Sequence, residues 1–302
     1  MAATRDVDIT TYDSLTLKAT FYGVGPARPC IIMSSGFSGL RGHFLPDFAS
    51  RFNAAGYGVL AYDNRCWGDS EGSPREEVDP WLQTRDYFDV FNYTATLSDV
   101  DPSKIVYWGS SMSGGNVICA AAVNKKIAAV IAQVPFASGE AIARLPGTST
   151  SLLTGNRSGD SHIQVPIWPS STEEVLSGTS KAVLKDPEAV AFTAELDRRG
   201  IDYSKVCTLQ SLTNTVLHEP QAYIHRISPT PLLMVVADQD VTTMAHLQFA
   251  AFEKALQPKT LKVLKGVGHF SPYYGETFEE NIKAQLEFLK DVLGPERDNE
   301  AR

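Results

Sequence analysis

Short runs of apolar residues, separated by longer amphipathic stretches, dominate the hydrophobic pattern of this chain. The short runs predict buried strands at residues 30–33, 58–62, 105–108, 128–133 and 232–236, and apolar and polar positions alternate at 261–264. The amphipathic stretches, in which apolar residues recur about every three or four positions, predict helices at 45–55, 85–97 and 117–123. Strands that are apolar throughout and alternate with helices indicate an α/β fold: a mostly parallel, twisted sheet with helices on both faces.

This rhythm is interrupted between residues 136 and 227. The interruption contains pieces rich in glycine, serine and threonine (147–151 and 177–180), a turn-rich piece (166–169) and two stretches of helical spacing (190–196 and 209–217). We therefore expect one α/β core formed by residues 1–135 and 228–302, with residues 136–227 inserted as a cap of short helices and loops.

A turn rich in glycine and serine follows the strand predicted at 105–108 and precedes a predicted helix. Acyl transfer needs a hydroxyl held on a sharp strand-to-helix turn with small neighbours, the G-x-S-x-G nucleophile elbow. Here Gly109 takes the first small position, Ser111 the nucleophile position and Ser113 the second small position. Such a pentapeptide alone is often only a turn, but its place between a strand and a helix favours Ser111 as a nucleophile.

His269 is the candidate for the general base that would activate this serine. It follows Gly266 and Gly268 in the loop after the last predicted strand, where the glycines let the imidazole reach over the sheet edge. The alternative is a loop histidine without a role. The other histidines combine neither this chain position nor this loop: His43, His162, His218, His225 and His246.

An acidic residue is expected to orient this imidazole from the loop after the strand at 232–236. That loop carries Asp238 and Asp240. Asp238 is closer to the strand end and suits a turn-capping role, whereas Asp240 lies further into the loop, where its carboxylate can reach the histidine, so Asp240 is favoured. The chain order Ser111, Asp240, His269 is the nucleophile, acid, base order of the α/β-hydrolase fold and predicts a catalytic triad.

An oxyanion hole needs two backbone N–H groups aimed at the negative charge that develops on the substrate. Met112, directly after the nucleophile, is expected to supply one. The loop at 34–39, after the first apolar strand, is expected to supply the other from Phe37, which would also place an aromatic ring beside the acyl pocket. The alternative is that this loop is only a tight strand-to-helix connection.

The loop at 63–72 follows the next strand and carries an Asp63/Arg65 pair, which we interpret as bracing of the loop. Cys66 lies in the same loop, in a setting that gives no sign of an activated thiol. Trp168, in the cap, is interpreted mainly as a core residue, but it is also a candidate for the wall of the substrate pocket.

Composition and charge limit the remaining possibilities. The 302 residues suffice for one large α/β domain, and the content of 43% hydrophobic and 21% charged residues is ordinary for a globular enzyme. The formal net charge of -8 argues against a nucleic-acid partner, because phosphate binding needs a basic surface. No apolar run approaches the roughly 18 residues of a membrane span, and the N-terminus lacks a secretory hydrophobic segment.

The four cysteines have no paired spacing and are expected to be reduced thiols of a cytoplasmic protein. The spacing of cysteines and histidines matches no zinc site, so no metal is expected. A glycine-rich dinucleotide fingerprint and a P-loop are also lacking, so no nucleotide cofactor is expected.

The motifs that carry a family resemblance extend over nearly the whole chain. They lie at residues 35–38, 62–72, 79–81, 109–115, 219–224, 227–234 and 268–270. In these motifs the chain resembles the dienelactone-hydrolase-like α/β hydrolases, a group that includes fungal polyketide transferases and thiohydrolases. The resemblance implies Ser111 as the nucleophile, Asp240 as the acid and His269 as the base.

Two positions depart from the pattern of that group. Ser35 stands where the group usually has histidine before the glycine of the oxyanion loop, which changes the polarity of the pocket wall. Met112 stands where an aromatic residue is common, which changes the fit of an acyl chain.

The function implied by the resemblance is release or transfer of a hydrophobic, polyketide acyl group from an ester or thioester in secondary metabolism. The substrate would be a small acyl molecule, presented by an acyl carrier protein or a polyketide synthase, and a homodimer is compatible with this role. One alternative keeps the fold but uses His269 as a general base for a non-covalent cyclisation or condensation of a polyketide. Another is a non-catalytic small-molecule-binding protein.

Overall fold

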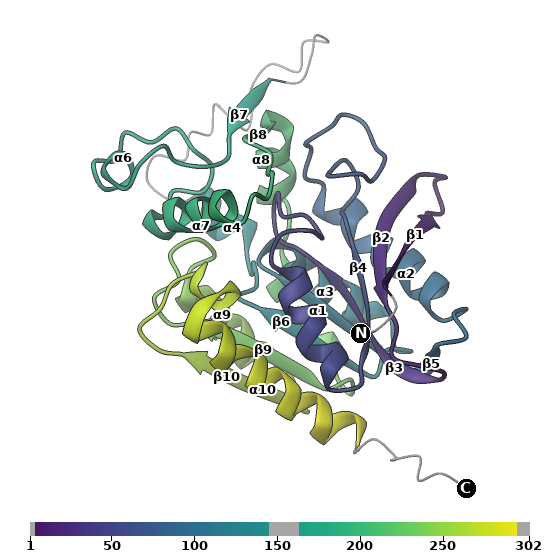
Figure 1. Ribbon diagram of the computed structural model, residues 1–302. Helices are drawn as coiled ribbons and strands as arrows, with labels where there is room; N and C mark the ends of the chain where they lie inside the picture. Colours follow the sequence, from purple (N-terminus) through teal and green to yellow (C-terminus); the bar gives the residue numbers. More distant parts are fainter. Residues whose placement is uncertain (1–3, 145–162, 295–302) are drawn as a thin grey trace, which may run out of the picture.

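A twisted sheet forms the core of the protein (Figure 1). The computed structural model describes residues 4–144 and 163–294. Within these residues the main sheet has eight strands in the order β1-β2-β4-β3-β5-β6-β9-β10. Their bounds are β1 Thr4–Thr10, β2 Thr16–Tyr22, β3 Arg28–Ser34, β4 Gly58–Tyr62, β5 Val100–Ser110, β6 Ala129–Gln133, β9 Leu232–Ala237 and β10 Lys259–Leu264. The neighbouring strands β4, β3, β5, β6, β9 and β10 all run parallel, whereas β2 pairs antiparallel with both β1 and β4.

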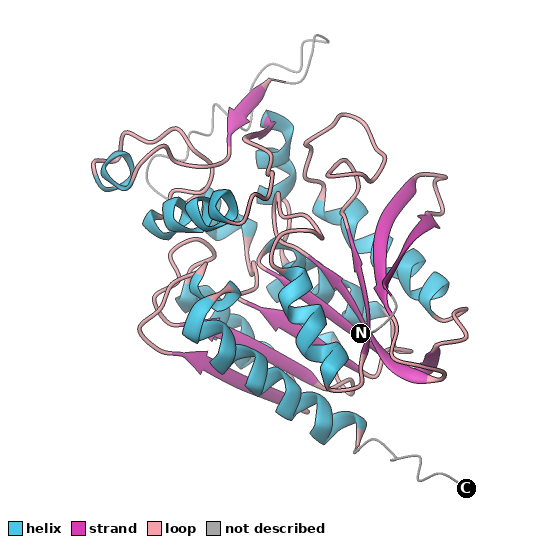
Figure 2. Cartoon of the chain, in the orientation of Figure 1, coloured by secondary structure: helices cyan, strands magenta, loops and turns pink. Residues whose placement is uncertain are grey.

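Helices cover both faces of this sheet (Figure 2). Successive side chains of a strand point to opposite faces. Cys30 and Ile32 of β3 therefore join a buried cluster with α2, α3 and α9, whereas Ile31 and Met33 join another with α1 and α10. The helix bounds are α1 Leu45–Ala54, α2 Pro80–Thr94, α3 Met112–Val123, α9 Ala245–Lys254 and α10 Gly275–Leu293. The predicted α/β fold is confirmed. In the described parts of the chain, no helix has both the length and the hydropathy needed to cross a lipid bilayer.

The predicted elements differ from the observed ones mainly at their ends. Helix α2 begins at Pro80 rather than 85, because the Asp79 carboxylate accepts the N–H groups of Trp81 and Leu82, both at 3.0 Å, and so caps an earlier turn. The hairpin of β1 and β2 was not predicted: β1 is largely exposed and carries only a weak apolar pattern. Helices α9 and α10 were not predicted either.

The cap elements lie together at one end of the sheet in Figure 1. They are α4 Gly139–Ala143, β7 Gln164–Pro166, α6 Thr172–Leu176, α7 Pro187–Arg198, β8 Val206–Thr208 and α8 Leu209–Val216. The 3₁₀ turns η1 Pro220–Ala222 and η2 Ile224–Arg226 follow along the chain and contact the core helix α3. The two helical segments expected at 190–196 and 209–217 are confirmed as α7 and α8. The antiparallel pair of β7 and β8 corrects the expectation of helices and loops alone. The cap boundaries at 136 and 227 stay predictions, and the piece at 147–151 lies outside the described residues.

Buried ion pairs hold the loop that follows β4. The Arg65 guanidinium donates to the buried Asp86 carboxylate of α2 at 2.8 Å and to Asp13 at 2.8 Å. Burial raises the pKa of Asp86 to about 6, against the opposing effect of the hydrogen bond and charge of Arg65. Bracing of this loop is thus confirmed, but with a correction of the partners: Asp63 pairs with Arg41 instead of Arg65.

We expect Arg65→Met to lower the free energy of unfolding by about 3–5 kcal/mol, because it leaves Asp86 as a buried carboxylate without its cation. Chemical denaturation followed by circular dichroism measures this. The matched control is Lys18→Met, which removes an ion pair with Asp8 at the surface and is expected to change stability by less than about 1 kcal/mol. Equal effects of the two substitutions would contradict the structural role given to Arg65.

Candidate active site

Ser111 occupies a sharp turn between β5 and α3. Its backbone has φ 57° and ψ −120°, a strained conformation for a residue with a side chain. Neighbouring backbone groups hold it there: its N–H donates to the Gln133 carbonyl at 2.9 Å, and its carbonyl accepts the N–H of Phe136 at 2.8 Å. The turn therefore places the Ser111 side chain at the carboxyl end of the sheet, in the geometry of a nucleophile elbow.

Small residues around this turn are required by close backbone packing. A Cβ added to Gly109 would lie 2.1 Å from the carbonyl oxygen of Ser113, and one added to Gly36 would lie 2.6 Å from Ser111 Cβ. Ser113 itself is fully buried, and its hydroxyl donates to the carbonyl of Ser35. The serine that replaces the usual glycine thus ties the elbow to the loop after β3.

The structure brings Ser111, His269 and Asp240 into one chain of hydrogen bonds. His269 Nε2 lies 2.9 Å from Ser111 Oγ, and His269 Nδ1 lies 2.7 Å from Asp240 Oδ2. This geometry assigns the proton to Nδ1 and leaves Nε2 free to accept from the serine hydroxyl. Asp238 instead accepts the N–H of Gly266 at 2.7 Å, so it binds the loop after β10 rather than a turn of its own loop.

Residues 31–280 match the sequence model of the Alpha/beta hydrolase family. The chain belongs to this family. It is 30% identical over 300 residues to the quorum-quenching protein AidA of Acinetobacter baumannii (strain MDR-ZJ06), covering 93% of this chain and 94% of the relative. It is also 30% identical over 289 residues to the polyketide transferase grgF of Penicillium sp, covering 94% and 95%.

Two solved structures are similar to this α/β hydrolase over almost their whole length. The crystal structure of α/β hydrolase GrgF from Penicillium sp. sh18 has a TM-score of 0.84 at 28% identity, covering 96% of this chain and 99% of that chain. The structure of DcsB in complex with its substrate analogue has a TM-score of 0.82 at 29% identity, covering 96% and 100%.

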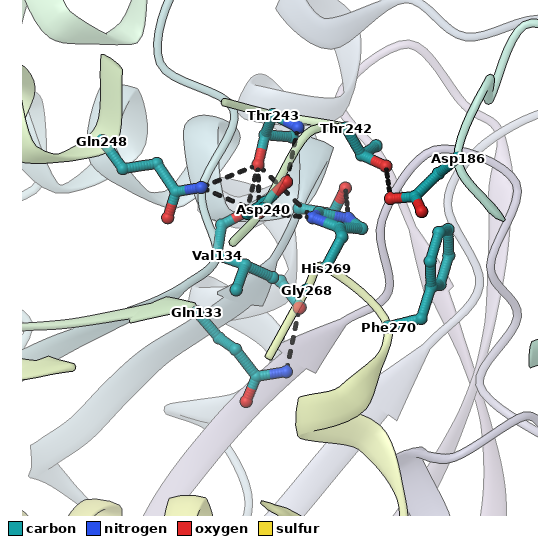
Figure 3. A network of polar contacts seen from close by, with 12 residues as sticks. Gln133, Val134, Asp186, Asp240, Thr242, Thr243, Gln248, Gly268, His269 and Phe270 are labelled. Atoms are coloured by element: carbon teal, nitrogen blue, oxygen red, sulfur yellow. Dashed lines mark hydrogen bonds and ion pairs between the residues drawn. The ribbon is translucent and has the colours of Figure 1, made fainter. Parts of the chain in front are cut away.

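Two residues that the sequence did not single out hold the carboxylate of Asp240 (Figure 3). Thr243 donates its N–H to Oδ1 and its hydroxyl to Oδ2, each at 2.9 Å, and Gln248 Nε2 donates to Oδ2 at 2.8 Å. Thr243 lies three residues after Asp240, a spacing at which an aspartate often accepts a backbone N–H, so the sequence could have indicated this contact. Gln248 comes from α9 and carries no sequence signal.

The histidine and the aspartate of this α/β hydrolase shift each other's pKa. Burial of the imidazole opposes its protonation, but the charge and hydrogen bond of Asp240 outweigh burial, so the pKa of His269 is raised. Burial likewise raises the pKa of Asp240, but the contacts with His269 and Thr243 outweigh it, so the net pKa of Asp240 is lowered. The pair therefore combines a carboxylate that stays ionised with an imidazole that binds a proton more readily than its burial alone would allow.

A narrow pocket opens onto Ser111 and His269. Ser35, Phe37 and Trp168 line it, and their contact with a substrate stays a prediction. The rest of the wall comes from Gly36, Ser38, Gly39, His43, Phe44, Leu184, Phe192, Phe270 and Tyr273. Its volume of about 40 Å³ gives room for only one or a few water molecules.

Phe37 and Met112, predicted to form the oxyanion hole, lie in one buried apolar cluster, and Met112 directly follows Ser111. Met112 is the first residue of α3, where an N–H group has no acceptor within the helix. Trp168 serves both roles considered for it: it stacks on Phe192 with ring centroids 5.7 Å apart and also lines the pocket.

Cys66 is buried, and burial raises its pKa to about 11, so this thiol is not activated at neutral pH. All four cysteines of the chain are free thiols. Within residues 4–144 and 163–294, no group of three or more histidine, cysteine, aspartate or glutamate side chains is placed to hold a metal ion.

We expect Gly109→Ala to lower the free energy of unfolding by about 1–3 kcal/mol, because the added methyl group overlaps the Ser113 carbonyl and must open the elbow. Gly42→Ala is the matched control, since a Cβ there meets nothing within 4 Å. Urea titration of the two variants compares them. The packing argument fails if both variants unfold at the same urea concentration as the unmodified protein.

Proposed function

We propose that this α/β hydrolase is a serine hydrolase or acyltransferase that acts on an ester or thioester of a hydrophobic acyl group. The observation that carries the proposal is the continuous hydrogen-bonded series from Ser111 through His269 to Asp240. A hydroxyl on a strained turn, a base within hydrogen-bond reach and a carboxylate that orients the base are the parts that covalent acyl transfer requires.

In the proposed first step, His269 Nε2 takes the proton of Ser111 while Oγ forms a bond to the acyl carbonyl carbon. The N–H groups of Phe37 and Met112 hold the resulting oxyanion, and loss of one such donor would raise the barrier by about 3 kcal/mol. When the intermediate collapses, the bond to the leaving alcohol or thiol breaks, and the leaving group takes the proton from His269. Asp240 keeps the imidazole oriented throughout.

In the second step, water or an acceptor alcohol or amine gives its proton to His269 and attacks the acyl-enzyme, and Ser111 leaves with that proton. Water makes the protein a hydrolase, and an acceptor makes it a transferase. The largely aromatic wall of the pocket, with Phe37, Phe44, Phe192 and Phe270, supports a hydrophobic acyl group. Exclusion of water from such a pocket by the bound acyl group would favour transfer over hydrolysis.

The names of the relatives support a polyketide acyl group. Besides the polyketide transferase grgF, they include the thiohydrolase of Eupenicillium brefeldianum at 28% identity and the acyltransferase drtE of Aspergillus calidoustus at 26%. We extend the proposal accordingly to a polyketide acyl thioester in secondary metabolism, presented by an acyl carrier protein or a polyketide synthase. Hydrolysis of a panel of acyl thioesters and simple esters of graded chain length measures this preference directly.

We expect a fluorophosphonate probe to label the folded protein on Ser111 and to leave Ser111→Ala unlabelled, because only an activated serine hydroxyl attacks such a phosphorus centre. Mass spectrometry of the labelled peptide identifies the site. Folded protein that stays unlabelled would count against covalent catalysis. Full activity of Ser111→Ala on the natural acyl substrate would instead select non-covalent cyclisation with His269 as the base.

The activity is expected to fall as the pH drops through the pKa of His269, because a protonated imidazole cannot accept the serine proton. Asp240→Asn removes the charge that raises this pKa and leaves the burial that lowers it, so the acidic limb moves to lower pH. The same change lowers kcat by about 1,000- to 10,000-fold. The measurement is kcat/KM for an activated ester against pH.

Asp238→Asn is the control for this profile, since it makes the same change two residues earlier in the same loop without contacting the imidazole. It is expected to leave the acidic limb in place. An acidic limb that stays unmoved in Asp240→Asn would exclude Asp240 as the partner of the titrating base.

A further inference from the structure

The first turn of the cap helix α7 reaches down to the loop that carries His269. Glu188 Oε1 accepts the N–H of Gly268 at 3.0 Å, and Glu188 Oε2 accepts the N–H of Phe270 at 3.0 Å. Oε1 also accepts the hydroxyl of Ser271 at 3.1 Å. One half-buried carboxylate thus binds the peptide N–H groups on both sides of the histidine.

This contact is fitted closely to the glycine at 268. A Cβ added to Gly268 would lie 2.6 Å from Cδ of Glu188 and 2.7 Å from each of its carboxylate oxygens. The carboxylate therefore rests directly on the backbone of the loop, and any residue larger than glycine would push it away. The loop needs such support, because Gly266 and Gly268 give its backbone large conformational freedom.

A second contact from the same turn of α7 reaches the loop of the acid (Figure 3). Asp186, the N-cap residue of α7, accepts the N–H of Glu188 at 2.8 Å and the hydroxyl of Thr242 at 2.6 Å. Thr242 precedes Thr243, which holds the carboxylate of Asp240. The start of α7 is therefore joined to both loops that supply the partners of Ser111.

We propose that Glu188 is a positioning residue that holds the His269 imidazole in line with Ser111 and Asp240. The inference rests on the proposed function, in which His269 is the base. Glu188 itself does not line the pocket at Ser111 and acts only through the backbone of the loop. Since it belongs to the cap, the base keeps its position only while the first turn of α7 stays docked on the core.

The charged surroundings of His269 make this role measurable by pH. The groups that act on the imidazole are Asp240 from the loop after β9, and Asp186 and Glu188 from the cap. His43 and Tyr273 line the same pocket, and burial lowers the pKa of His43 to about 4 and raises that of Tyr273, so both are neutral near pH 7. Removing the charge of Glu188 therefore lowers the pKa of His269.

Two substitutions separate the effect of the Glu188 charge from the effect of its side-chain length. Glu188→Gln removes the charge and turns an amide donor toward one of the two N–H groups, so we expect kcat to fall about 10- to 100-fold through misplacement of the imidazole. Its acidic limb moves down by about 0.5 pH unit. Glu188→Asp keeps the charge but shortens the side chain by one methylene, so kcat falls while the acidic limb stays in place. KM is little changed in both.

The matched control is Glu195→Gln, which makes the same charge change on the same helix, where Glu195 faces Arg198 and Arg199 instead of the histidine loop. The control is expected to keep kcat and the pH profile. A Glu188→Gln variant that is folded and has the kcat and pH profile of Glu195→Gln would overturn the proposal. Denaturant titration of each variant separates these effects from loss of folding.

A double-substitution cycle tests the same contact if Glu188→Gln alone is unstable. Gly268→Ala is expected to lower kcat as much as Glu188→Ala does, because the alanine methyl group displaces the Glu188 carboxylate. The double variant is expected to have a kcat no lower than either single variant, since both substitutions abolish the same contact. Losses that multiply in the double variant would contradict a shared contact.

The pKa of the His269 ring, measured by NMR on protein with ¹³C-labelled histidine and assigned with His269→Asn, needs no substrate. A lower pKa in Glu188→Gln than in Glu195→Gln supports the placement of Glu188 at the imidazole, and equal values oppose it. Failure of the proposed function appears separately, as absence of fluorophosphonate labelling of the unmodified protein.

Discussion

The buried carboxylate of Asp240 is the constraint on which the rest of the site depends. A carboxylate removed from water is tolerated only when it is paired and hydrogen-bonded. Here the imidazole of His269, both donors of Thr243 and the amide of Gln248 surround it. These donors come from three different segments, so satisfying one charge fixes the relative positions of the loop after β9, helix α9 and the loop after β10.

The topology of the sheet makes that convergence possible. The strands β5, β9 and β10 run parallel, so the three loops that follow them leave from the same edge. Ser111 needs additional support from its surroundings, because its backbone is strained. Gly36 and Gly109 have no side chains that would clash with the turn at Ser111, and the Ser113 hydroxyl donates a hydrogen bond from this turn to the loop after β3. The same loop carries Phe37, so one bond positions both the serine and the predicted oxyanion donor.

The sequence contained the parts of this arrangement that are local or ordered along the chain. Apolar runs predict the buried parallel strands. Three residues that the structure brings together were indicated by the turn at Ser111, by the glycines before His269 and by the predicted order of nucleophile, acid and base. The contacts of Gln248 and Glu188 could not be predicted, because a polar residue on a helix has the same local pattern whether it faces solvent or a catalytic loop. Strand β1 is largely exposed and β2 buries only alternate residues, so neither has the continuous apolar run of the buried parallel strands.

Helix α7 of the cap contacts both the pocket and the loop that carries His269. Phe192 of α7 lines the pocket and stacks on Trp168, while the first turn of the same helix holds the loop of His269 through Glu188. In the proposed function, this cavity of about 40 Å³ would have to widen before an acyl chain could enter, and widening would move residues of α7. A substrate that let α7 return to its docked position would restore the contacts of Glu188, whereas one that held α7 away would leave the histidine loop without them. Under the proposed function, acyl groups would then be selected partly through the alignment of His269 and not through the pocket wall alone.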